Sequence, residues 1–493
     1  MEATASDSSL AAGTRRVSRS RRIAAERAIK VFFGSNALVA IAVLALITIF
    51  LFREGFGFFG ENLTNLRLYR RAGLEYVDVI RAQAQQHAAL ARELSQIRLR
   101  ENDLSALAVF DQFAGRFSDA GEELNALLSD TSDEAVALRD ALIAAPGEAI
   151  DLTQLRAAEG RFGQIVPPMR EKIDNLIQNA PALRNARAQT ALAKWERVAQ
   201  EFLAQLPGTL QQLQAWDPLK PVPAYRAVTS FLFGTEWITA SFWQDWYGII
   251  PLFVGSILVA TVAMVIAVPF GVASAIYVSE VAGQSEKSLI KPYLEFVSAI
   301  PSVVLGFFGI AVFGETVRAL SRLPIFSWVP FFPIEERLNI FTAGCLLALM
   351  AVPSIFTLSE DALRNVPRGF KEASYALGAN RLQTIARVLV PASLSGIVSA
   401  SLLGLGRVIG ETMVVLLCAG NRIAIPDFTQ GLGTVFQPVH TMTGIIAQEM
   451  GEVVRGSIHY RALFMVGLVL FGLTLGINYL AQRVVARYRM SIG

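Results

Sequence analysis

Six long apolar stretches dominate the pattern of hydrophobic and polar positions along the chain. An α-helix needs roughly 20 mostly apolar residues to cross the hydrocarbon core of a bilayer, and each stretch is near that length. The stretches cover residues 31–52, 249–277, 296–313, 340–357, 397–417 and 463–480. Proline and glycine inside several of them suit a packed bundle, in which neighbouring helices satisfy the freed backbone groups. The pattern therefore predicts an all-α membrane protein with six transmembrane helices.

A long polar-rich segment separates the first two stretches. Between residues 57 and 225 its apolar positions recur three and four apart, as they do in amphipathic helices. This spacing predicts an antiparallel bundle of about four to six helices. Turn-forming residues predict helix boundaries at 129–133, Pro146-Gly147, Pro167-Pro168, Pro181 and Pro207-Gly208. Thr131 and Glu134 have the spacing of a capping box that opens a helix, and we expect the solitary His87 on the surface.

Basic residues set the orientation of the predicted helices. Arginine and lysine gather on the cytoplasmic side of membrane proteins. Here they cluster before the first stretch, between the fourth and fifth, and after the last. They are Arg15, Arg16, Arg19, Arg21, Arg22, Arg27 and Lys30, then Arg364, Arg368, Lys371, Arg381 and Arg387, and then Arg483, Arg487 and Arg489. We therefore expect both termini in the cytoplasm and an uncleaved first helix.

These features divide the chain into four parts. We expect a basic N-terminal segment at 1–30, a first transmembrane helix at 31–52, a helical insert outside the inner membrane at 53–245, and a membrane core with five helices at 246–493. The core includes a cytoplasmic loop at 360–392. The insert suits a docking or regulatory module and equally a structural extension, and its sequence favours neither.

Composition narrows the functional classes. Hydrophobic residues make up 53% of the 493-residue chain, and the mean hydropathy is +0.44. A net charge of only +3 gives no sign of a nucleic-acid surface. Cys345 and Cys418 sit in apolar runs and predict neither a disulfide nor a metal site. The sequence has no P-loop, zinc-protease motif or nucleophile elbow, so we expect no enzyme activity and no cofactor, with ATP hydrolysis on a separate chain.

Two charged residues lie inside the fifth apolar stretch. Arg407 and Glu411 are four residues apart, which on a continuous helix places them on one face. A central arginine costs about 2.5–3.5 kcal/mol on insertion scales, so such residues usually face the bundle interior or a wet cavity. Either Arg407 meets an anion in transit while Glu411 limits its affinity, or the two form a structural ion pair. Thr412 and Ser302, beside Pro301, are weaker pathway positions, because their hydroxyls also suit local bonding or close helix packing.

The cytoplasmic loop between the fourth and fifth stretches carries a helix, a glycine break and a second helix. It reads Glu372-Ala373-Ser374-Tyr375-Ala376-Leu377-Gly378-Ala379, and later Val388-Leu389-Val390-Pro391. Pro367 suits the first turn of the first helix, and Gly378 suits a left-handed residue at its end. Asn380 and Gln383 can form a capping box for the next helix. Such a loop either transmits force from a partner or lies at the membrane surface without one.

These residues resemble the EAA motif of ABC importer permeases, in which Glu-Ala-Ala, three residues and Gly are followed, nine residues later, by Ile-x-Leu-Pro. The spacing is kept here, with Ser374 at the third position and Val388 and Val390 as the apolar pair. The resemblance implies a coupling helix that seats in a groove of a cytoplasmic ATPase, present in two copies. The coupling residues that it implies are Glu372, Ala373, Ser374, Gly378 and Ala379.

Shorter segments of the membrane part are similar to phosphate permeases of the PstC type. They are Leu51-Phe52-Arg53-Glu54-Gly55, Phe233-Gly234-Thr235-Glu236-Trp237, Ala299-Ile300-Pro301-Ser302-Val303-Val304 and Gly406-Arg407-Val408-Ile409-Gly410-Glu411-Thr412-Met413. The resemblance covers 31–56 and about 230–490, and it leaves out the insert. It implies a type I ABC importer permease fold, a PstA-like second permease and a periplasmic phosphate-binding protein. It also implies that Arg407 and Glu411 take part in the passage of phosphate.

We therefore expect a permease subunit in a bacterial inner membrane that forms, with a second permease, a path for inorganic phosphate. A permease for another oxyanion stays open, because selectivity lies largely in the receptor. A membrane sensor with a periplasmic helical domain is a different class, and the six spans and the coupling loop argue against it. The spacing of the motif also argues against an ion-coupled transporter, which would need no ATPase.

Overall fold

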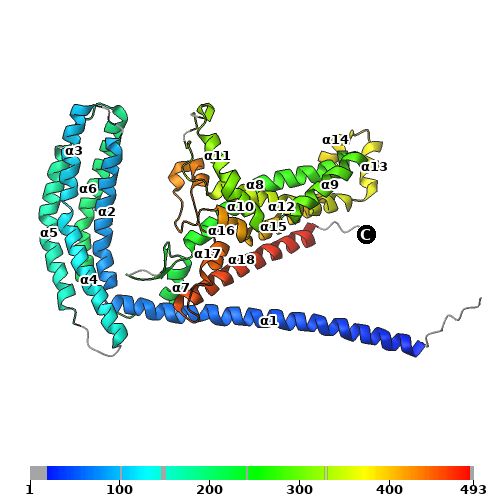
Figure 1. Ribbon diagram of the computed structural model, residues 1–493, viewed down its shortest axis with the longest axis horizontal. Coiled ribbons are helices and arrows are strands. Elements are labelled where there is room, and N and C mark those ends of the chain that lie inside the picture. Colours follow the sequence, from blue (N-terminus) through cyan, green and yellow to red (C-terminus); the bar gives the residue numbers. More distant parts are fainter. Residues whose placement is uncertain are drawn as a thin grey trace, which may run out of the picture.

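The computed structural model describes residues 19–99, 101, 103–145, 151–239, 243–326, 328–329 and 331–488. This part of the chain is almost wholly helical (Figure 1). A bundle of helices stands at one end of the molecule and a second helical body occupies the other. One long helix runs past the second body and ends at the base of the bundle.

The long helix is α1 (Arg19–Arg71), and it is uninterrupted. It contains the predicted first span, but it continues well beyond residue 52. It continues because its outer half has partners: Phe58 and Tyr69 are both buried. The predicted basic segment 1–30 falls largely outside the described residues, and Arg15 and Arg16 fall there with it.

Five helices after α1 form the insert, within the predicted range of four to six. They are α2 (Leu74–Arg98), α3 (Leu104–Asp119), α4 (Glu122–Ala144), α5 (Thr153–Gln178) and α6 (Ala186–Gln214). Their inner faces build one apolar core. At its centre Trp195 is 1% exposed and donates its indole N–H to the Leu90 carbonyl at 2.9 Å. The spacing of apolar residues by three and four thus becomes the buried side of each helix.

Several predicted boundaries inside the insert are wrong. α5 runs straight through Pro167-Pro168, and α6 runs through Pro207. An internal proline costs a helix about 3 kcal/mol, and burial of side chains such as Val166 and Met169 on either side outweighs that cost. The break predicted at Pro181 is confirmed by the gap between α5 and α6. The one predicted at Pro146-Gly147 lies outside the described residues.

The predicted capping box at Thr131 is also wrong. α4 passes through 129–133 without a break, so Thr131 has no free helix end to cap. The residue is 1% exposed, and its hydroxyl donates to the Leu127 carbonyl of the preceding turn at 2.6 Å. A buried threonine can satisfy its hydroxyl in this way inside a helix.

His87 lies in the core of the insert and not on its surface as predicted. Its ring stacks on Phe117 with centroids 4.6 Å apart, and Nε2 is 3.0 Å from the Phe117 carbonyl oxygen. Burial lowers the pKa of His87, and the hydrogen bond to Phe117 only partly opposes this effect. The imidazole is therefore held neutral and acts as an aromatic core residue with one satisfied nitrogen.

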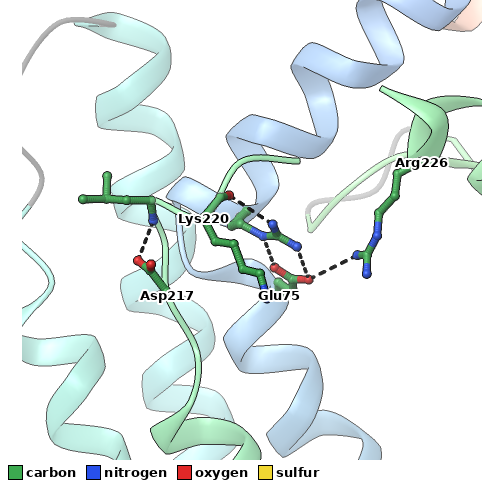
Figure 2. Close-up of polar contacts among 6 residues, drawn as sticks. Glu75, Asp217, Lys220 and Arg226 are labelled. Atoms are coloured by element: carbon green, nitrogen blue, oxygen red, sulfur yellow. Dashed lines mark hydrogen bonds and ion pairs between the residues drawn. The ribbon is translucent and has the colours of Figure 1, made fainter. Parts of the chain in front are cut away.

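An ion-pair cluster fixes the base of the insert to the rest of the molecule (Figure 2). Arg70 of α1 donates to the Glu75 carboxylate at 2.6 and 2.9 Å and to the Lys220 carbonyl at 3.1 Å. Arg226, on α7 (Tyr225–Leu232), approaches the same carboxylate at 3.7 Å. Burial raises the pKa of Glu75, but the hydrogen bond and charge of Arg70 outweigh it and lower the pKa overall. The cluster thus joins α1, α2 and α7.

A short hairpin makes a second contact between the insert and the membrane core. β1 (Trp237–Ile238) pairs antiparallel with β2 (Trp246–Tyr247). Between the two strands, the indole of Trp243 lies under the guanidinium of Arg81, and Cζ of Arg81 is 3.8 Å from the centroid of the indole ring. The Trp243 carbonyl accepts a hydrogen bond from Arg139 at 2.9 Å. The hairpin leads directly into the second membrane helix.

Six stretches of the described chain are long and apolar enough to cross a membrane, as predicted. They are Ile29–Arg71, Ile250–Val281, Ser302–Ser321, Ile340–Arg364, Arg381–Ile409 and Ile458–Ala486. The third begins at Ser302 and not at 296. Ile300 and Pro301 take extended backbone angles there and separate α9 (Gln284–Ala299) from α10 (Ser302–Phe308).

The remaining elements complete the membrane core and its loops. They are α8 (Ile250–Ile276), η1 (Tyr277–Val281), η2 (Gly309–Phe313), α11 (Gly314–Ser321), η3 (Pro324–Phe326), α12 (Ile340–Arg364), α13 (Arg368–Ala376), α14 (Arg381–Thr384), η4 (Ile385–Leu389), α15 (Val390–Ile409), α16 (Met413–Cys418), η5 (Phe428–Phe436), α17 (Met442–Glu449) and α18 (Ile458–Tyr488). α8, α12 and α15 form the centre, where small residues such as Ala263 and Ala343 are fully buried. In Figure 1, α13 and α14 lie at one end of this core and α17 at the other.

Candidate functional site

The fifth span is interrupted inside the membrane core. α15 ends at Ile409, and α16 begins at Met413. Gly410, Glu411 and Thr412 lie between the two helices and are not helical. The predicted continuous span at 397–417 is therefore wrong in its last third, and the charged positions fall at the break.

Packing against α12 shows how deep the break lies. Gly396 of α15 packs on Ala362 of α12. Further along α15, Gly404 packs on Ile355, so the two helices run antiparallel. On this register α15 ends beside Met350, about 15 Å from the N-terminal end of α12 at the usual helical rise. Non-helical backbone at such a depth is tolerated only where protein or a wet cavity satisfies its polar groups.

Arg407 points from α15 towards the middle of α12. Its Nη1 donates to the Ser354 hydroxyl at 2.6 Å. Ser354 is near the midpoint of α12, so the guanidinium lies beside the middle of that helix and within the predicted span. The Arg407 side chain is nevertheless exposed on the surface of this chain. Because contact of a guanidinium with lipid at that depth is costly, this surface has to face another protein or a wet path.

Glu411 leaves the helix, so the predicted placement of Arg407 and Glu411 on one helix face is wrong. Its Oε1 accepts the Met413 amide at 3.2 Å, and its freed carbonyl accepts the Thr443 hydroxyl of α17 at 2.8 Å. The recorded partner of Arg407 is Ser354, and no ion pair joins Arg407 to Glu411 among the described residues. The two still line one small recess together with Leu347, Met350, Ala351 and Val408.

Thr412 lies within the break, and Ser302 lies on a different helix. Thr412 directly precedes α16 and is partly buried. Ser302 opens α10, one turn before Gly306, which packs on Leu417 of α16. Within the described part of the chain neither hydroxyl makes a hydrogen bond. Neither residue lines the recess of Arg407 and Glu411, so the structure does not join Ser302 to the two charges.

The loop between α12 and α15 has the predicted helix, glycine turn and second helix, but Pro367 lies just before α13 and not in its first turn. α13 starts after Pro367 and is followed by Gly378 at a φ of 84°, a left-handed conformation that glycine adopts without strain. The amide of Ala379 donates to the Ser374 carbonyl at 3.2 Å and closes the helix end. The predicted capping box of Asn380 opens α14. Local sequence therefore determines this helix, turn and helix.

The outer face of α13 is open. Glu372 and Ala373 are exposed, and Leu377 is 89% exposed. A recess beside this face is lined by Phe370, Ala373, Ser374, Leu377, Gly378, Ala379, Gln383, Arg387 and Val388. Ser374 itself is 8% exposed, with its hydroxyl 2.9 Å from that of Thr384. Ser374 thus holds α13 to α14, while the other motif residues border the open face.

Two buried acids that sequence reasoning missed lie near the C-terminal ends of the second and fourth membrane helices. Glu280 in η1 binds Lys371 of α13, with Nζ 2.6 Å from Oε2. Glu360 in α12 pairs with Lys291 and Arg364, each at 2.8 Å. Their sequence signal is an acid at the edge of an apolar stretch, followed in the case of Glu360 by Asp361. No group of three metal-ligating side chains was found among the residues that the structure describes.

Residues 267–490 match the family described as "Binding-protein-dependent transport system inner membrane component". The probable ABC transporter permease protein YqgH of Bacillus subtilis is 35% identical over 242 residues, which are 48% of this chain and 72% of that protein. The phosphate transport system permease protein PstC of Haemophilus influenzae is 32% identical over 292 residues, 57% of this chain and 86% of that protein.

Among solved structures, an inward-facing MetNI methionine ABC transporter aligns with a TM-score of 0.34 and 20% identity, over 49% of this chain and 94% of that one. The family match spans the cytoplasmic loop and the broken fifth span, and the insert lies outside it. With relatives above 30% identity covered over more than two thirds of their lengths, this chain belongs to the family of inner membrane permeases of binding-protein-dependent transport systems.

Proposed function

We propose that this chain carries inorganic phosphate across the inner membrane as one of two permease subunits. Members of its family are transport components and not enzymes, and they work with a separate ATPase and a binding protein. The similarity to a phosphate transport system permease supports phosphate as the substrate. The observation that carries the proposal is the exposed Arg407, held beside the break in the fifth span and against the middle of α12.

Arg407 offers an anion site within the predicted span. A guanidinium binds phosphate through several N–H donors, and the bond to Ser354 occupies only one nitrogen of Arg407. Glu411 borders the same recess, and its carboxylate repels the anion. That repulsion limits affinity, which lets the substrate leave again. Thr412 supplies a further hydroxyl at the break, and Ser302 supplies one on α10.

A PstA-like second permease completes the path. The side of Arg407 that this chain leaves exposed needs a polar or protein cover in the membrane. A second six-helix subunit facing this surface would enclose the path between the two chains. The two permease subunits would then expose only their apolar helix surfaces to lipid.

The cytoplasmic loop is the proposed contact with the ATPase, present as a dimer. Glu372, Ala373, Gly378 and Ala379 border its open face, and Ser374 fixes the turn behind it. A short helix closed by the turn at Gly378 and held to α14 by Ser374 moves as a unit, so it can transfer a movement of the ATPase to the spans. ATP hydrolysis would then drive alternating access.

A periplasmic phosphate-binding protein is the proposed partner of the opposite face. The loops at 331–338 and 422–438 enclose a cavity of about 620 Å³ there. Charged side chains line it, namely Glu335, Glu336, Arg422 and Asp427. The insert at 53–245 would stand on this same side, outside the inner membrane, with both termini of the chain in the cytoplasm.

Uptake of labelled phosphate at low concentration tests the substrate. The chain and its partner subunits are supplied to cells that lack every other phosphate importer. We expect uptake that needs this chain and resists competition by excess sulfate. If excess sulfate or another oxyanion abolishes the uptake, that oxyanion would replace phosphate as the proposed substrate. If the chain is inserted in the membrane yet supports no oxyanion uptake, the result would favour a membrane sensor over a permease.

The same cells test the ATPase contact. Glu372→Arg reverses a charge on the exposed face of α13, and we expect it to reduce uptake to background. Glu295→Gln is the matched control, because Glu295 is also exposed near the cytoplasmic side. Normal uptake by a well-expressed Glu372→Arg chain would remove α13 from the ATPase interface.

A further inference from the structure

The second membrane helix does not stop at the end of α8. It continues into η1, a π-helical turn in which the Ala282 amide donates to the Tyr277 carbonyl at 2.8 Å. Single π-turns occur frequently at functional positions of helices. In this turn Glu280 is 8% exposed, although it is a carboxylate at the edge of a membrane span. A buried acid there needs specific partners.

Glu280 contacts the coupling loop, α13 with α14, through two separate groups. Its carboxylate binds Lys371 Nζ, which is 2.7 Å from Oε1 and 2.6 Å from Oε2. Its backbone carbonyl accepts a hydrogen bond from the guanidinium of Arg381. Lys371 lies on α13 and Arg381 opens α14, on either side of the turn at Gly378. One residue of the α8 segment therefore holds both arms of the loop.

Further contacts support this geometry. The Ser279 hydroxyl donates to Oε1 of Glu280 at 3.1 Å. Beside it, Val278 is buried in an apolar cluster with Phe356 of α12 and with Ile385 and Leu389 of η4. The apolar contacts bring the three segments together. The ion pair then fixes how α13 sits against η1, because the buried carboxylate of Glu280 is stabilised only by a partner in good geometry.

The second buried acid, Glu360, makes a useful contrast. It binds Lys291 of α9 and Arg364 of its own helix. Neither of these partners lies on α13 or α14. Of the two buried acids at this face, Glu280 is thus the one whose recorded ion pair reaches the coupling loop.

We propose that Glu280 is a positioning residue that joins the coupling loop to α8. It holds α13 at a fixed angle to the second membrane helix, so that a movement imposed on the loop is passed to α8. At its other end α8 follows the hairpin that contacts the insert, and the same movement reaches the periplasmic side. The inference rests on the proposed role of the loop in ATPase coupling.

A spin label on Leu377→Cys tests the positioning without any transport assay. Leu377 is 89% exposed, and Cys345 and Cys418 are replaced by alanine in this background. In the full-length chain in lipid nanodiscs, Glu280→Gln and Lys371→Met should both increase the mobility of the label. Glu295→Gln should not, because its carboxylate is exposed. A spectrum of Glu280→Gln identical to that of the parent chain would overturn the proposal.

The charge-exchanged pair separates positioning from a general loss of folding. Glu280→Lys and Lys371→Glu each place like charges together, while the double variant restores opposite charges. We expect receptor-stimulated ATP hydrolysis of the assembled transporter to fall at least about fivefold in each single variant, the lower range of typical coupling effects. The double variant should recover at least half of it. A double variant as impaired as the singles, with normal assembly, contradicts the proposal.

Label mobility and receptor-stimulated ATP hydrolysis together distinguish a failure of the Glu280 proposal from a failure of the phosphate proposal. If Glu280→Gln frees the label but phosphate and its receptor do not stimulate the parent transporter, the phosphate proposal fails and the positioning stands. If stimulation is normal in the parent and in both single variants, the positioning fails and the phosphate proposal stands.

Discussion

The insert and the membrane core build helices from the same amino acids but hold them together differently. The insert is organised around large side chains, with Trp195, Phe110 and Phe117 at most 1% exposed. The membrane core is organised around small ones, with Ala263, Ala343 and others almost fully buried between α8, α12 and α15. In water, burial of large apolar groups drives packing. In lipid, close approach of backbones takes over that role.

The same local signals consequently have different outcomes in the two regions. In the insert, Pro167-Pro168 does not interrupt α5, because core contacts on both sides hold the helix. In the membrane core, an apolar run without any proline breaks at Gly410, where Glu411 finds partners in Met413 and Thr443. This break in the membrane core thus lies beside two charged residues, and we propose it as a functional position.

The largest effect should come from the charge at the break. We expect Arg407→Gln to lower phosphate uptake at least about 100-fold, because the main attraction for the anion in the membrane is removed. Ser354→Ala should lower it only a few-fold, since the guanidinium stays and merely loses one partner. Labelled-phosphate uptake, normalised to membrane-inserted protein, measures both. Equal losses in the two variants would mean that the bond matters and the charge does not.

The next largest effect should come from the core of the insert. Trp195→Ala removes a fully buried indole and should destabilise the bundle by about 3–5 kcal/mol. Hydrogen exchange followed by mass spectrometry should then accelerate throughout α2 to α6 and stay unchanged in α12. Val109→Ala, at a position 57% exposed, is the control and should change neither. Acceleration that spreads into α12 would show that the two regions unfold together.

A smaller effect is expected at the junction of the two regions. Glu75→Gln weakens the charged hydrogen bonds from Arg70 and should cost about 1–3 kcal/mol of local stability. Faster exchange at the end of α1 and the start of α2 is the measurement. Glu171→Gln, at an exposed position of α5, is the matched control. Unchanged exchange in Glu75→Gln would mean that the hairpin alone fixes the insert.

The smallest effect is the pH dependence of the insert. Because the pKa of His87 is lowered in the folded protein, the unfolded chain takes up the proton first as the pH falls below about 6.5. The contribution of His87 to folding stability should therefore decrease by at most about 1 kcal/mol as the pH falls from 7 to 5.5. Asp78, whose pKa burial raises to about 6, changes stability in the opposite direction, so the His87 effect is measured as the difference between the parent chain and a His87 variant. His87→Gln keeps a donor for the Phe117 carbonyl and should remove this slope. An identical slope in His87→Gln would assign the acid sensitivity to other groups.

Local and periodic signals predicted much of this architecture. The six spans, the helical insert, the turn at Gly378 and the capping box of Asn380 all depend on residues that are near one another in sequence. The bounds of the third and fifth spans were wrong, because hydropathy does not show where a buried chain breaks. Glu280 and Lys371, or Arg407 and Ser354, are far apart in sequence, and only tertiary packing brings them together. The burial of His87 follows from the same kind of packing.

Transport by purified components tests the central claim most directly. Liposomes would contain this chain, its partner permease and the ATPase, with the receptor and labelled phosphate outside and ATP inside. The account predicts ATP-dependent accumulation of phosphate that requires all of these proteins and that Arg407→Gln abolishes. Accumulation that is unchanged when this chain carries Arg407→Gln would contradict a phosphate path at the break in the fifth span.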